Sequence, residues 1–310
     1  AEQSLRNARM SPRIPYMVTN FISSEVKLRF DENDFPGFYT VYRTIRSYPR
    51  KIGGNLLGDV GEINERQLKM KRYADYRSGD YVGQSGVEKA YEEELRGKKG
   101  VKIMEKDTHG VVKGSYMDGM FDSLPEPGNY IVTTIDARLQ AFTEELMRGK
   151  VGAAVAIEPS TGEILMMVSS PTFDPDEMVG RHRGNNYMKM LYNKRQPMFN
   201  RAVKAKYPPG STFKLVQGLI GLQEGVLTPA DRYSCNGGFR YGHRMMKCHA
   251  HASPLDLRGA VANSCNAYFC YVLRNILENR RYEDVEHGFD MWKTYVNSLG
   301  FGRKLESDFL

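Results

Sequence analysis

Apolar and polar positions follow different patterns in the two parts of this chain, which meet near residue 130. In the first part, charged residues and tyrosines are interrupted by glycine and proline. Helical periodicity predicts two short helices there, over 65–76 and 87–96. Alternation predicts a strand within 101–112 that turns at His109-Gly110. The glycine-rich run 53–58 predicts a turn, or a bend within a pair of strands.

The second part of the chain has longer apolar runs, and their periodicity predicts regular strands and helices. Strands are predicted at 130–134, 151–158 and 163–169, a helix at 139–149, and further helices from Ser211 and from Ser264. A Pro-Ser-Thr-Gly turn joins the last two strands. Antiparallel strands beside helices indicate an α+β fold.

A run rich in proline and glycine, 125–129, separates the two patterns and is typical of a junction. It predicts one domain over 1–129 and a second over 130–310. At 310 residues the chain is long enough for two domains.

Composition describes an ordinary globular protein with a basic excess. The chain is 41% hydrophobic and 26% charged, with a net charge of +7. No apolar run approaches the roughly 18 residues of a membrane-spanning helix. Basic clusters such as Lys69, Lys71 and Arg72 occur without any nucleic-acid-binding motif. We therefore expect no nucleic-acid partner, and interpret the charge as a solvated face or an attraction to anionic membrane and cell wall.

A serine three residues before a lysine stands in the segment 207–214 (YPPGSTFK). Pro208, Pro209 and Gly210 favour a sharp turn, and the apolar pattern that follows predicts a helix. Residues three apart share a helix face, so Lys214 can reach the Ser211 hydroxyl. A partly desolvated amine can take the proton of a serine, which is the chemistry of acyl transfer through a serine ester. The plainer interpretation is a helix-capping serine with a solvated lysine.

The same spacing also occurs at Ser24 and Lys27, where no turn precedes a helix. A second motif, Ser264-Cys265-Asn266, opens another apolar run and favours catalysis. Its serine hydroxyl can relay a proton to a leaving group, and the Asn266 amide can hold the lysine and a substrate carbonyl. The matching Ser234-Cys235-Asn236 runs into two glycines and is typical of a turn instead.

These motifs, with the surrounding segments, resemble the class B penicillin-binding proteins, and among them the elongation type. The segments that carry the resemblance are 83–97, 135–140, 154–165, 200–202, 207–214 and 264–266. The resemblance implies a mixed α/β pedestal of the dimerisation type, followed by the N-terminal part of a transpeptidase domain with an antiparallel sheet flanked by helices.

The implied activity is that of a peptidoglycan D,D-transpeptidase in cell elongation. Ser211 would attack the penultimate D-alanine of a stem peptide, with Lys214 as general base. Ser264 would relay a proton, and Asn266 would orient the substrate and Lys214. β-Lactams would acylate Ser211 because they mimic the D-alanyl-D-alanine end. The implied partners are stem peptides, β-lactams and, through the pedestal, a membrane glycosyltransferase of the elongation machinery.

The family has a third motif, Lys-Thr-Gly or Lys-Ser-Gly, and neither tripeptide occurs in these 310 residues. The family also carries an N-terminal membrane helix that this sequence lacks. We therefore expect a fragment that is inactive alone, from a periplasmic protein anchored to the inner membrane. A carboxypeptidase or β-lactamase-like hydrolase, and a scaffold without catalysis, remain alternatives.

All four cysteines lie between residues 235 and 270, among three histidines. Three interpretations stay open. One is a Cys235–Cys248 disulfide, which the implied periplasm favours, and another is a set of structural thiols that includes Cys270. The third is a structural zinc site from Cys235, Cys248, His251 and Cys265, although its spacing is not that of a zinc finger. The chemistry itself requires no cofactor.

Overall fold

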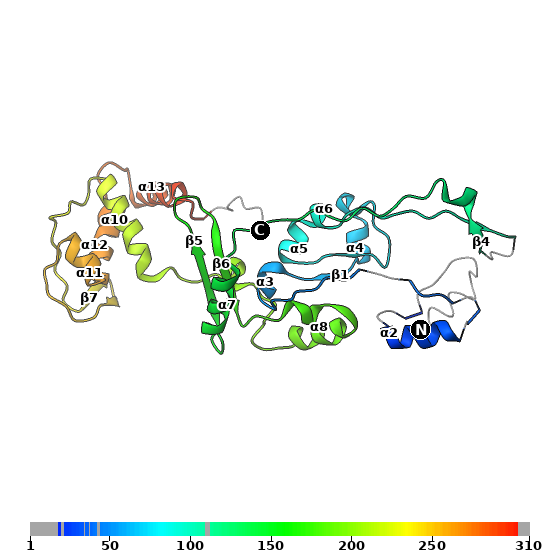
Figure 1. Ribbon diagram of the computed structural model, residues 1–310. Coiled ribbons are helices and arrows are strands. Elements are labelled where there is room, and N and C mark those ends of the chain that lie inside the picture. The colour runs from blue at the N-terminus through cyan, green and yellow to red at the C-terminus, as the bar shows by residue number, and fades with distance from the viewer. Residues whose placement is uncertain are drawn as a thin grey trace. The chain divides into compact units, whose positions relative to one another are not determined.

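The computed structural model describes residues 18–19, 22–33, 35–36, 38–41, 44–108 and 112–302. The predicted turn at His109-Gly110 lies outside these residues. The chain divides into two compact units, with unit 1 ending at Ala205 and unit 2 beginning at Lys206 (Figure 1). Both units mix helices with short antiparallel strand pairs, so the predicted α+β class is confirmed.

The first part of unit 1 consists of short elements joined by loops. Of the two antiparallel pairs, β1 with β2 lies beside short helices, whereas β3 with β4 lies at the end of an extended arm (Figure 1). The elements are α2 (Ser24–Glu32), α3 (Gly54–Leu57), β1 (Val60–Glu62), α4 (Glu65–Leu68), the 3₁₀ turn η1 (Lys71–Tyr73), β2 (Tyr81–Gly83), α5 (Gly86–Ala90), α6 (Glu92–Leu95), β3 (Met104–Lys106), β4 (Val112–Ser115) and η2 (Tyr116–Gly119).

Both helices predicted in this part are shorter than expected. The segment 65–76 forms only α4 and η1, and 87–96 is divided into α5 and α6 because Tyr91 leaves helical geometry. The prediction for 53–58 is wrong, since this run forms the short helix α3. Gly53 adopts the left-handed conformation in front of it, and its amide donates to Glu144 Oε1 at 2.7 Å. A contact with a residue 91 positions away cannot be read from local turn chemistry.

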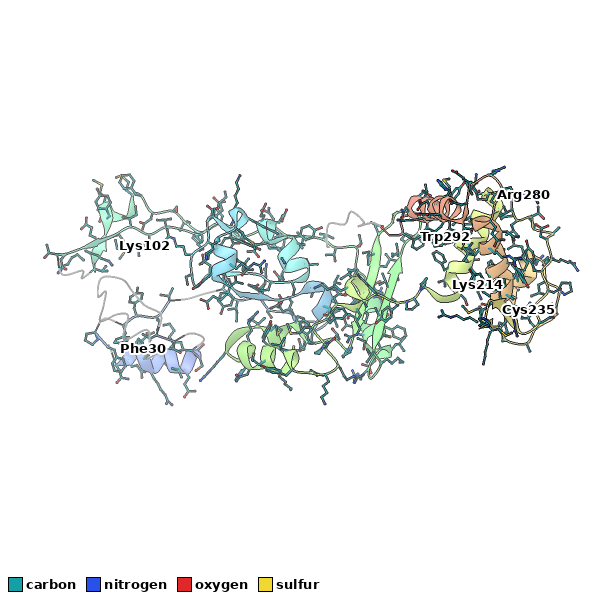
Figure 2. All side chains as sticks on the ribbon, turned by 180° about the vertical axis from the view of Figure 1, so that it is seen from behind. Phe30, Lys102, Lys214, Cys235, Arg280 and Trp292 are labelled. Atoms are coloured by element: carbon teal, nitrogen blue, oxygen red, sulfur yellow. The ribbon has the colours of Figure 1, made fainter. Side chains whose placement is uncertain are left out.

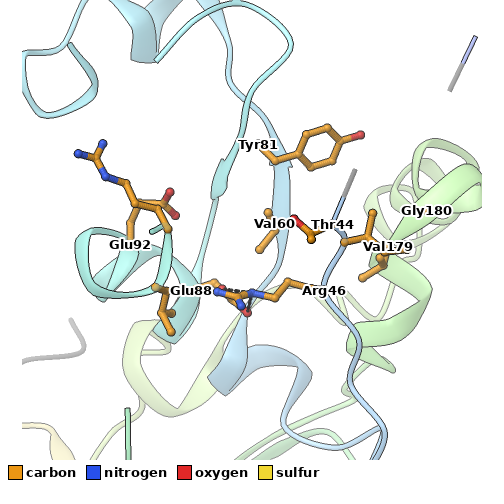
Figure 3. A pocket seen from close by; sticks show the side chains of 11 residues that line it. Thr44, Arg46, Val60, Tyr81, Glu88, Glu92, Val179 and Gly180 are labelled. Carbon is orange, nitrogen blue, oxygen red and sulfur yellow. Dashed lines mark hydrogen bonds and ion pairs between the residues drawn. The ribbon is translucent and has the colours of Figure 1, made fainter. Parts of the chain in front are cut away.

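Two buried carboxylates line a cavity of about 190 Å³ in this part of unit 1 (Figure 3). Glu88 accepts a hydrogen bond from the Tyr48 hydroxyl at 2.9 Å and pairs with Arg46 at 3.0 Å. Glu92 accepts from the Gly83 amide at 2.6 Å. Burial, with Glu88 adding to it, raises the pKa of Tyr48 far above its usual range. Both carboxylates are thus hydrogen-bonded within the fold, as buried polar groups usually are.

The second part of unit 1 is built on the predicted hairpin, which is confirmed as β5 (Gly152–Ile157) and β6 (Ile164–Ser170). The predicted helix lies beside it as α7 (Ala137–Leu146). Gln140 of α7 is 1% exposed, and its side-chain amide both donates to and accepts from the Met167 backbone at 2.9 Å. The remaining elements are η3 (Pro175–Met178), η4 (Gly180–His182), α8 (Arg183–Leu191) and α9 (Arg201–Lys204).

The strand predicted at 130–134 is absent from the described residues, and that prediction is wrong. This segment reaches β6 through the Thr134 hydroxyl, which donates to the Ile164 carbonyl at 2.7 Å. The Asp136 amide donates to the Leu165 carbonyl at 2.9 Å. Tyr130 and Val132 are almost fully exposed, so the segment has apolar side chains but no sheet partner for its backbone.

Polar contacts join the two parts of unit 1. The Asp59 side chain, 5% exposed, pairs with Arg183 at 2.6 Å. The Tyr48 amide donates to Asp176 at 2.9 Å. These contacts explain why residues up to 205 pack with the first part of the chain. The domain boundary predicted between 129 and 130 stays a prediction.

Unit 2 packs helices against a second hairpin, β7–β8, that the sequence did not predict (Figure 1). Its elements are η5 (Gly210–Thr212), α10 (Phe213–Gln223), β7 (Gly238–Tyr241), β8 (Arg244–Lys247), α11 (Leu257–Ala262), α12 (Asn266–Leu277) and α13 (Val285–Ser298). Tyr268, Val272 and Ile276 of α12 are at most 1% exposed. Helix α10 lies so close to α12 that a Cβ on Gly221 would stand 2.8 Å from Val272 Cγ1.

The helix predicted after Ser211 is confirmed as α10, and three leucines of its apolar pattern are exposed. Leu215, Leu219 and Leu222 are 55%, 59% and 37% exposed. Helix α10 buries Gln217, Gly218, Ile220 and Gly221 against the unit 2 core. Small residues allow two helix backbones to approach closely, and apolar periodicity alone does not predict that the face with these residues is the one that packs.

A buried carboxylate, Glu224, ties the end of α10 to the following helices. Glu224 is 4% exposed and accepts hydrogen bonds from Tyr282, Tyr295 and Asn279 at 2.6, 2.7 and 3.1 Å. Burial alone would raise its pKa, but these donors outweigh burial and lower the pKa below its usual range. Helix α10 is thus fixed at its C-terminal end, ten residues after Lys214.

Candidate active site

Ser211 lies in the 3₁₀ turn η5 that leads into α10. Gly210 before it has φ +65°, a conformation that glycine adopts without strain. The turn leaves Ser211 exposed and one turn ahead of Lys214. Among the described residues, no hydrogen bond joins the Ser211 hydroxyl to Lys214. The serine therefore has the predicted place on the segment, without the predicted contact.

Lys214 is the centre of a hydrogen-bond network with the second motif. Its Nζ donates to the Ser264 carbonyl at 2.6 Å, to Ser264 Oγ at 3.0 Å and to Asn266 Oδ1 at 2.6 Å. The same Nζ lies 6.0 Å from the centre of the Phe269 ring. Three acceptors match the three donors of an ammonium group. The structure thus brings together three of the four predicted residues within unit 2, around Lys214, which Figure 2 labels.

The three acceptors differ in what they can do next. A carbonyl oxygen and an amide oxygen only accept, whereas the Ser264 hydroxyl can accept or donate. The contact between Lys214 and Ser264 Oγ is therefore the one through which a proton can pass in either direction. This geometry suits general acid–base chemistry, and it needs a nucleophile beside the amine.

The backbone of Ser264 has φ +49°, in the left-handed region that non-glycine residues seldom occupy. Such a conformation costs about 1–2 kcal/mol. Two hydrogen bonds hold it, from the Ser264 amide to Val261 O at 3.0 Å and from the Cys265 amide to Ala260 O at 2.9 Å. As a result, both the carbonyl and the hydroxyl of Ser264 face Lys214.

Asn266, the first residue of α12, connects this network to the rest of the loop. Its Nδ2 donates to the Lys247 carbonyl at 2.8 Å, and its amide donates to Cys248 Sγ at 3.2 Å. The sequence did not single out Lys247 or the β7–β8 hairpin. The run 232–255 contains no acidic residue, which marks the charge of this segment but not its strand pairing.

The two other sequence matches, at Ser24–Lys27 and at Ser234–Asn236, have no part in the network. Ser24 and Lys27 lie on α2 in unit 1, where Lys27 pairs with Asp31. Ser234 lies in the loop before β7, next to Cys235. The choice of Ser211 and Ser264 over these residues is consistent with the contacts of Lys214.

The four residues predicted as metal ligands lie together. One ligand atom each from Cys235, Cys248, His251 and Cys265 lies within 4.8 Å of every other. Zinc–sulfur bonds of about 2.3 Å place tetrahedral ligands roughly 3.8 Å apart, so only a small contraction is needed to hold the ion. Three thiols and one imidazole form a set typical of structural zinc. Among the described cysteines no disulfide is formed.

The thiols of this cluster differ in how easily they ionise. Burial acts to raise the pKa of Cys248, but the Asn266 amide and His251, at 3.5 Å, outweigh it and lower that pKa to about 6. Burial raises the pKa of Cys265 to about 11. The Ala252 carbonyl and the Cys248 thiol raise the pKa of His251. A metal ion would remove the protons from all of these ligands.

Comparisons with known proteins agree with this geometry. The model of the penicillin-binding protein transpeptidase domain matches residues 152–310, and that of the penicillin-binding protein dimerisation domain matches 2–133. The peptidoglycan D,D-transpeptidase MrdA of Acinetobacter baumannii is 32% identical over 98% of this chain and 44% of its own length.

Solved structures give the same result. The structure of Pseudomonas aeruginosa PBP2 in complex with WCK 5153 is similar with a TM-score of 0.65 and 29% identity, over 87% of this chain and 53% of that one. The Helicobacter pylori complex between PBP2 and MreC shares the fold, with a TM-score of 0.79 and 23% identity, over 99% of this chain and 59% of that one. The chain spans about half the length of the curated relatives it matches. From its matched transpeptidase and dimerisation domains, the chain belongs to the penicillin-binding protein family.

Proposed function

We propose that the protein to which this chain belongs is a peptidoglycan D,D-transpeptidase of cell elongation. The observation that carries the proposal is the set of contacts from Lys214 Nζ to Ser264 and Asn266, one turn along from Ser211. A lysine fixed by a serine and an asparagine beside a second serine suits acyl transfer through a serine ester.

In the proposed reaction, the Ser211 hydroxyl attacks the carbonyl of the penultimate D-alanine of a stem peptide. Lys214 accepts the hydroxyl proton, and the proton reaches the departing amine of the terminal D-alanine through Ser264. The Ser211 amide, at the start of a helix, supplies one donor for the developing oxyanion. An amine of a second stem peptide then attacks the Ser211 ester, which forms the cross-link and returns the proton to the serine.

The proposal extends to location and partners. Within the described ranges, no helix is both long and apolar enough to cross a bilayer. We propose that the protein works in the periplasm, anchored to the inner membrane, and that its pedestal contacts a membrane glycosyltransferase. Support comes from the dimerisation-domain match and from a relative that forms a complex with MreC.

We also propose a structural zinc ion bound by Cys235, Cys248, His251 and Cys265. The four ligand atoms are already grouped, and Cys265 is the residue between Ser264 and Asn266. When bound, the ion would hold this loop in place, and it would supply no step of the reaction.

Acylation of the full-length protein by a fluorescent penicillin tests the proposed function. We expect one stoichiometric adduct, which peptide mass spectrometry assigns to the peptide with Ser211, and none in the Ser211→Ala variant. An adduct that survives this substitution would show that another residue is the nucleophile. Release of free acid from a stem peptide, with no cross-linked product when an amine is present, would favour the hydrolase alternative.

The role of Lys214 has its own test. Lys214→Ala should slow acylation by about a hundredfold to ten-thousandfold, because a positioned base is lost. Lys293→Ala, which removes an exposed lysine of α13, is the matched control. Near-parental acylation by the Lys214 variant would assign the base to a different group. If the wild type forms no penicillin adduct at all, the scaffold alternative is favoured.

A further inference from the structure

The β7–β8 hairpin of unit 2 carries an unusual charge pattern. The 24 residues between Asp231 and Asp256 contain Arg232, Arg240, Arg244 and Lys247, and no aspartate or glutamate. All four of these cations are exposed, and in the described part of the chain none of them forms an ion pair. Clustered cations without acidic partners repel one another, so such a cluster favours an anionic ligand.

The register of the hairpin sorts these side chains onto two faces. Residues directly opposite in an antiparallel pair share a face, and Phe239 pairs with Met246 while Arg240 pairs with Met245. Phe239 is 9% exposed and packs against Tyr271 of α12, so its face is the inner one. Met246 shares this face and is 57% exposed, so of the two only Phe239 is packed inside. Arg240 and Met245 lie on the opposite face, which is the outer one.

Lys247 completes this outer face, because it pairs with Gly238 and lies two residues from Met245. Gly238 has no side chain, and a Cβ built there would stand 3.0 Å from Met245 Cε. The end of Met245 thus lies over Gly238. The outer face, defined as Arg240, Met245 and Lys247, presents an apolar patch between two cations.

This outer face begins at the catalytic network. The Lys247 carbonyl accepts from Asn266 Nδ2 at 2.8 Å, and Asn266 Oδ1 accepts from Lys214. From Lys247 to Met245, strand β8 rises by about 3.3 Å per residue, so the face extends roughly 7 Å. That length matches about two residues of an extended peptide.

We propose that the outer face of β7–β8 binds the stem peptide through its free carboxylates, upstream of the bond that Ser211 attacks. The proposal rests on the proposed function and names the part of the substrate that this face contacts. A stem peptide offers carboxylates for Arg240 and Lys247, and alanyl methyl groups for Met245. Arginine and lysine bind carboxylates through charge-assisted hydrogen bonds, which suits a mobile, acidic peptide.

Binding is measured in the full-length Ser211→Ala protein, so that no acylation interferes. The probe is a disaccharide pentapeptide that carries a neutral dye and free carboxylates, followed by fluorescence anisotropy. The double variant Arg240→Gln/Lys247→Gln should raise its Kd about tenfold, because two exposed ion pairs are lost. The effect should shrink with salt. A probe with amidated carboxylates should bind wild type and variant equally.

Arg280→Gln is the matched control, since it removes one exposed cation from a part of unit 2 that lies away from Cys235 and Lys214 in Figure 2. It should leave the Kd unchanged. A change in Kd below twofold in the double variant, or an equal rise in Kd in the control, would overturn the proposal. The same holds if the wild type binds the amidated probe as tightly as the probe with free carboxylates. Loss of zinc from the double variant would overturn it too, since the effect would then come from the metal cluster.

Two more measurements separate the possible failures. Acylation of wild-type Ser211 by penicillin tests the proposed function alone. If the protein is acylated but the Kd of the peptide probe does not depend on its carboxylates, only the role of the hairpin is overturned. Sedimentation with phosphatidylglycerol vesicles tests a lipid surface as the anionic ligand. Vesicle binding that depends on Arg240 and Lys247, without binding of the carboxylate probe, would also overturn the proposal.

Discussion

At Ser264 a strained backbone and a reactive side chain belong to one residue, and two substitutions separate their effects. Ser264→Ala and Ser264→Gly both remove the hydroxyl that contacts Lys214. Both should slow acylation to a similar degree, about a hundredfold, if this hydroxyl relays the proton. Only glycine accepts φ +49° without strain. The glycine variant should therefore be more stable than the alanine variant, by about 1 kcal/mol.

Acylation by fluorescent penicillin and thermal unfolding of the same samples check this prediction. If the glycine variant keeps parental acylation, the hydroxyl is not the relay. If the alanine variant is the more stable of the two, the left-handed conformation at residue 264 carries no strain.

The residues of the candidate site are proposed from the sequence, but the contacts between them could not be predicted. Ser211, Lys214, Ser264 and Asn266 follow from residue type and spacing, because each occupies a recognisable motif. The left-handed backbone of Ser264 follows from two hydrogen bonds within the turn, and no spacing rule contains them. The Lys247 carbonyl was missed because any residue type supplies a carbonyl.

At the scale of elements, the loop from β7 to α12 combines the cysteine cluster with the second motif. If zinc holds this loop, the protein purified without added metal should contain about one equivalent, and Cys248→Ser should lose most of it. The same variant should slow acylation, because Asn266 loses the sulfur that accepts its amide hydrogen. Cys270→Ser is the control, since Cys270 lies outside the group of four.

Elemental analysis and the acylation rate check this prediction together. Less than about a tenth of an equivalent of zinc, with Cys235 and Cys248 found in a disulfide, would rule out the zinc site and favour the disulfide interpretation of this loop. Equal zinc loss from the Cys270 variant would show that the four-ligand group is wrongly assigned.

Glu224 makes the attachment of α10 depend on pH. Its folded-state pKa is lowered, so the carboxylate contributes stability above its unfolded pKa of about 4.3. That contribution disappears as the pH falls through the lower folded value. The wild type should therefore unfold at a higher temperature than Glu224→Gln at pH 7, and this difference should shrink below about pH 4.3.

Thermal unfolding of both proteins between pH 7 and pH 3 is the measurement. Glu278→Gln, which removes an exposed carboxylate of the same unit, controls for the general effect of charge. If the difference in unfolding temperature between wild type and Glu224→Gln stays constant or increases on acidification, Glu224 is not held as a carboxylate.

Among the elements, the β5–β6 hairpin and the α7, α10 and α12 helices were the predictable ones, because their apolar residues repeat with a clear period. The segment 130–134 has the same alternation, yet it forms no strand, because a strand needs a partner for its backbone. The β7–β8 hairpin is the opposite case. It is short and rich in cations, so its sequence resembles a loop, and its pairing depends on packing of Phe239 against α12.

At the scale of the molecule, packing and family assignment divide the chain differently. The buried pair of Asp59 with Arg183 joins a residue of the dimerisation match to one of the transpeptidase match within unit 1. A charge pair 124 positions apart has no sequence signature. The junction 125–129 is visible in composition, but the contacts that cross it are not.

The 310 residues contain no Lys-Thr-Gly or Lys-Ser-Gly, which the family places on a strand beside the nucleophile, and the Ser211 amide is one oxyanion donor of two. Loss of one such donor costs roughly 3 kcal/mol of transition-state stabilisation. The 310-residue chain should therefore react with penicillin about a hundredfold more slowly than the full-length protein, even when circular dichroism shows it folded. Rapid, stoichiometric acylation of the short chain would mean that the network of Lys214, Ser264 and Asn266 suffices for acylation without the third motif.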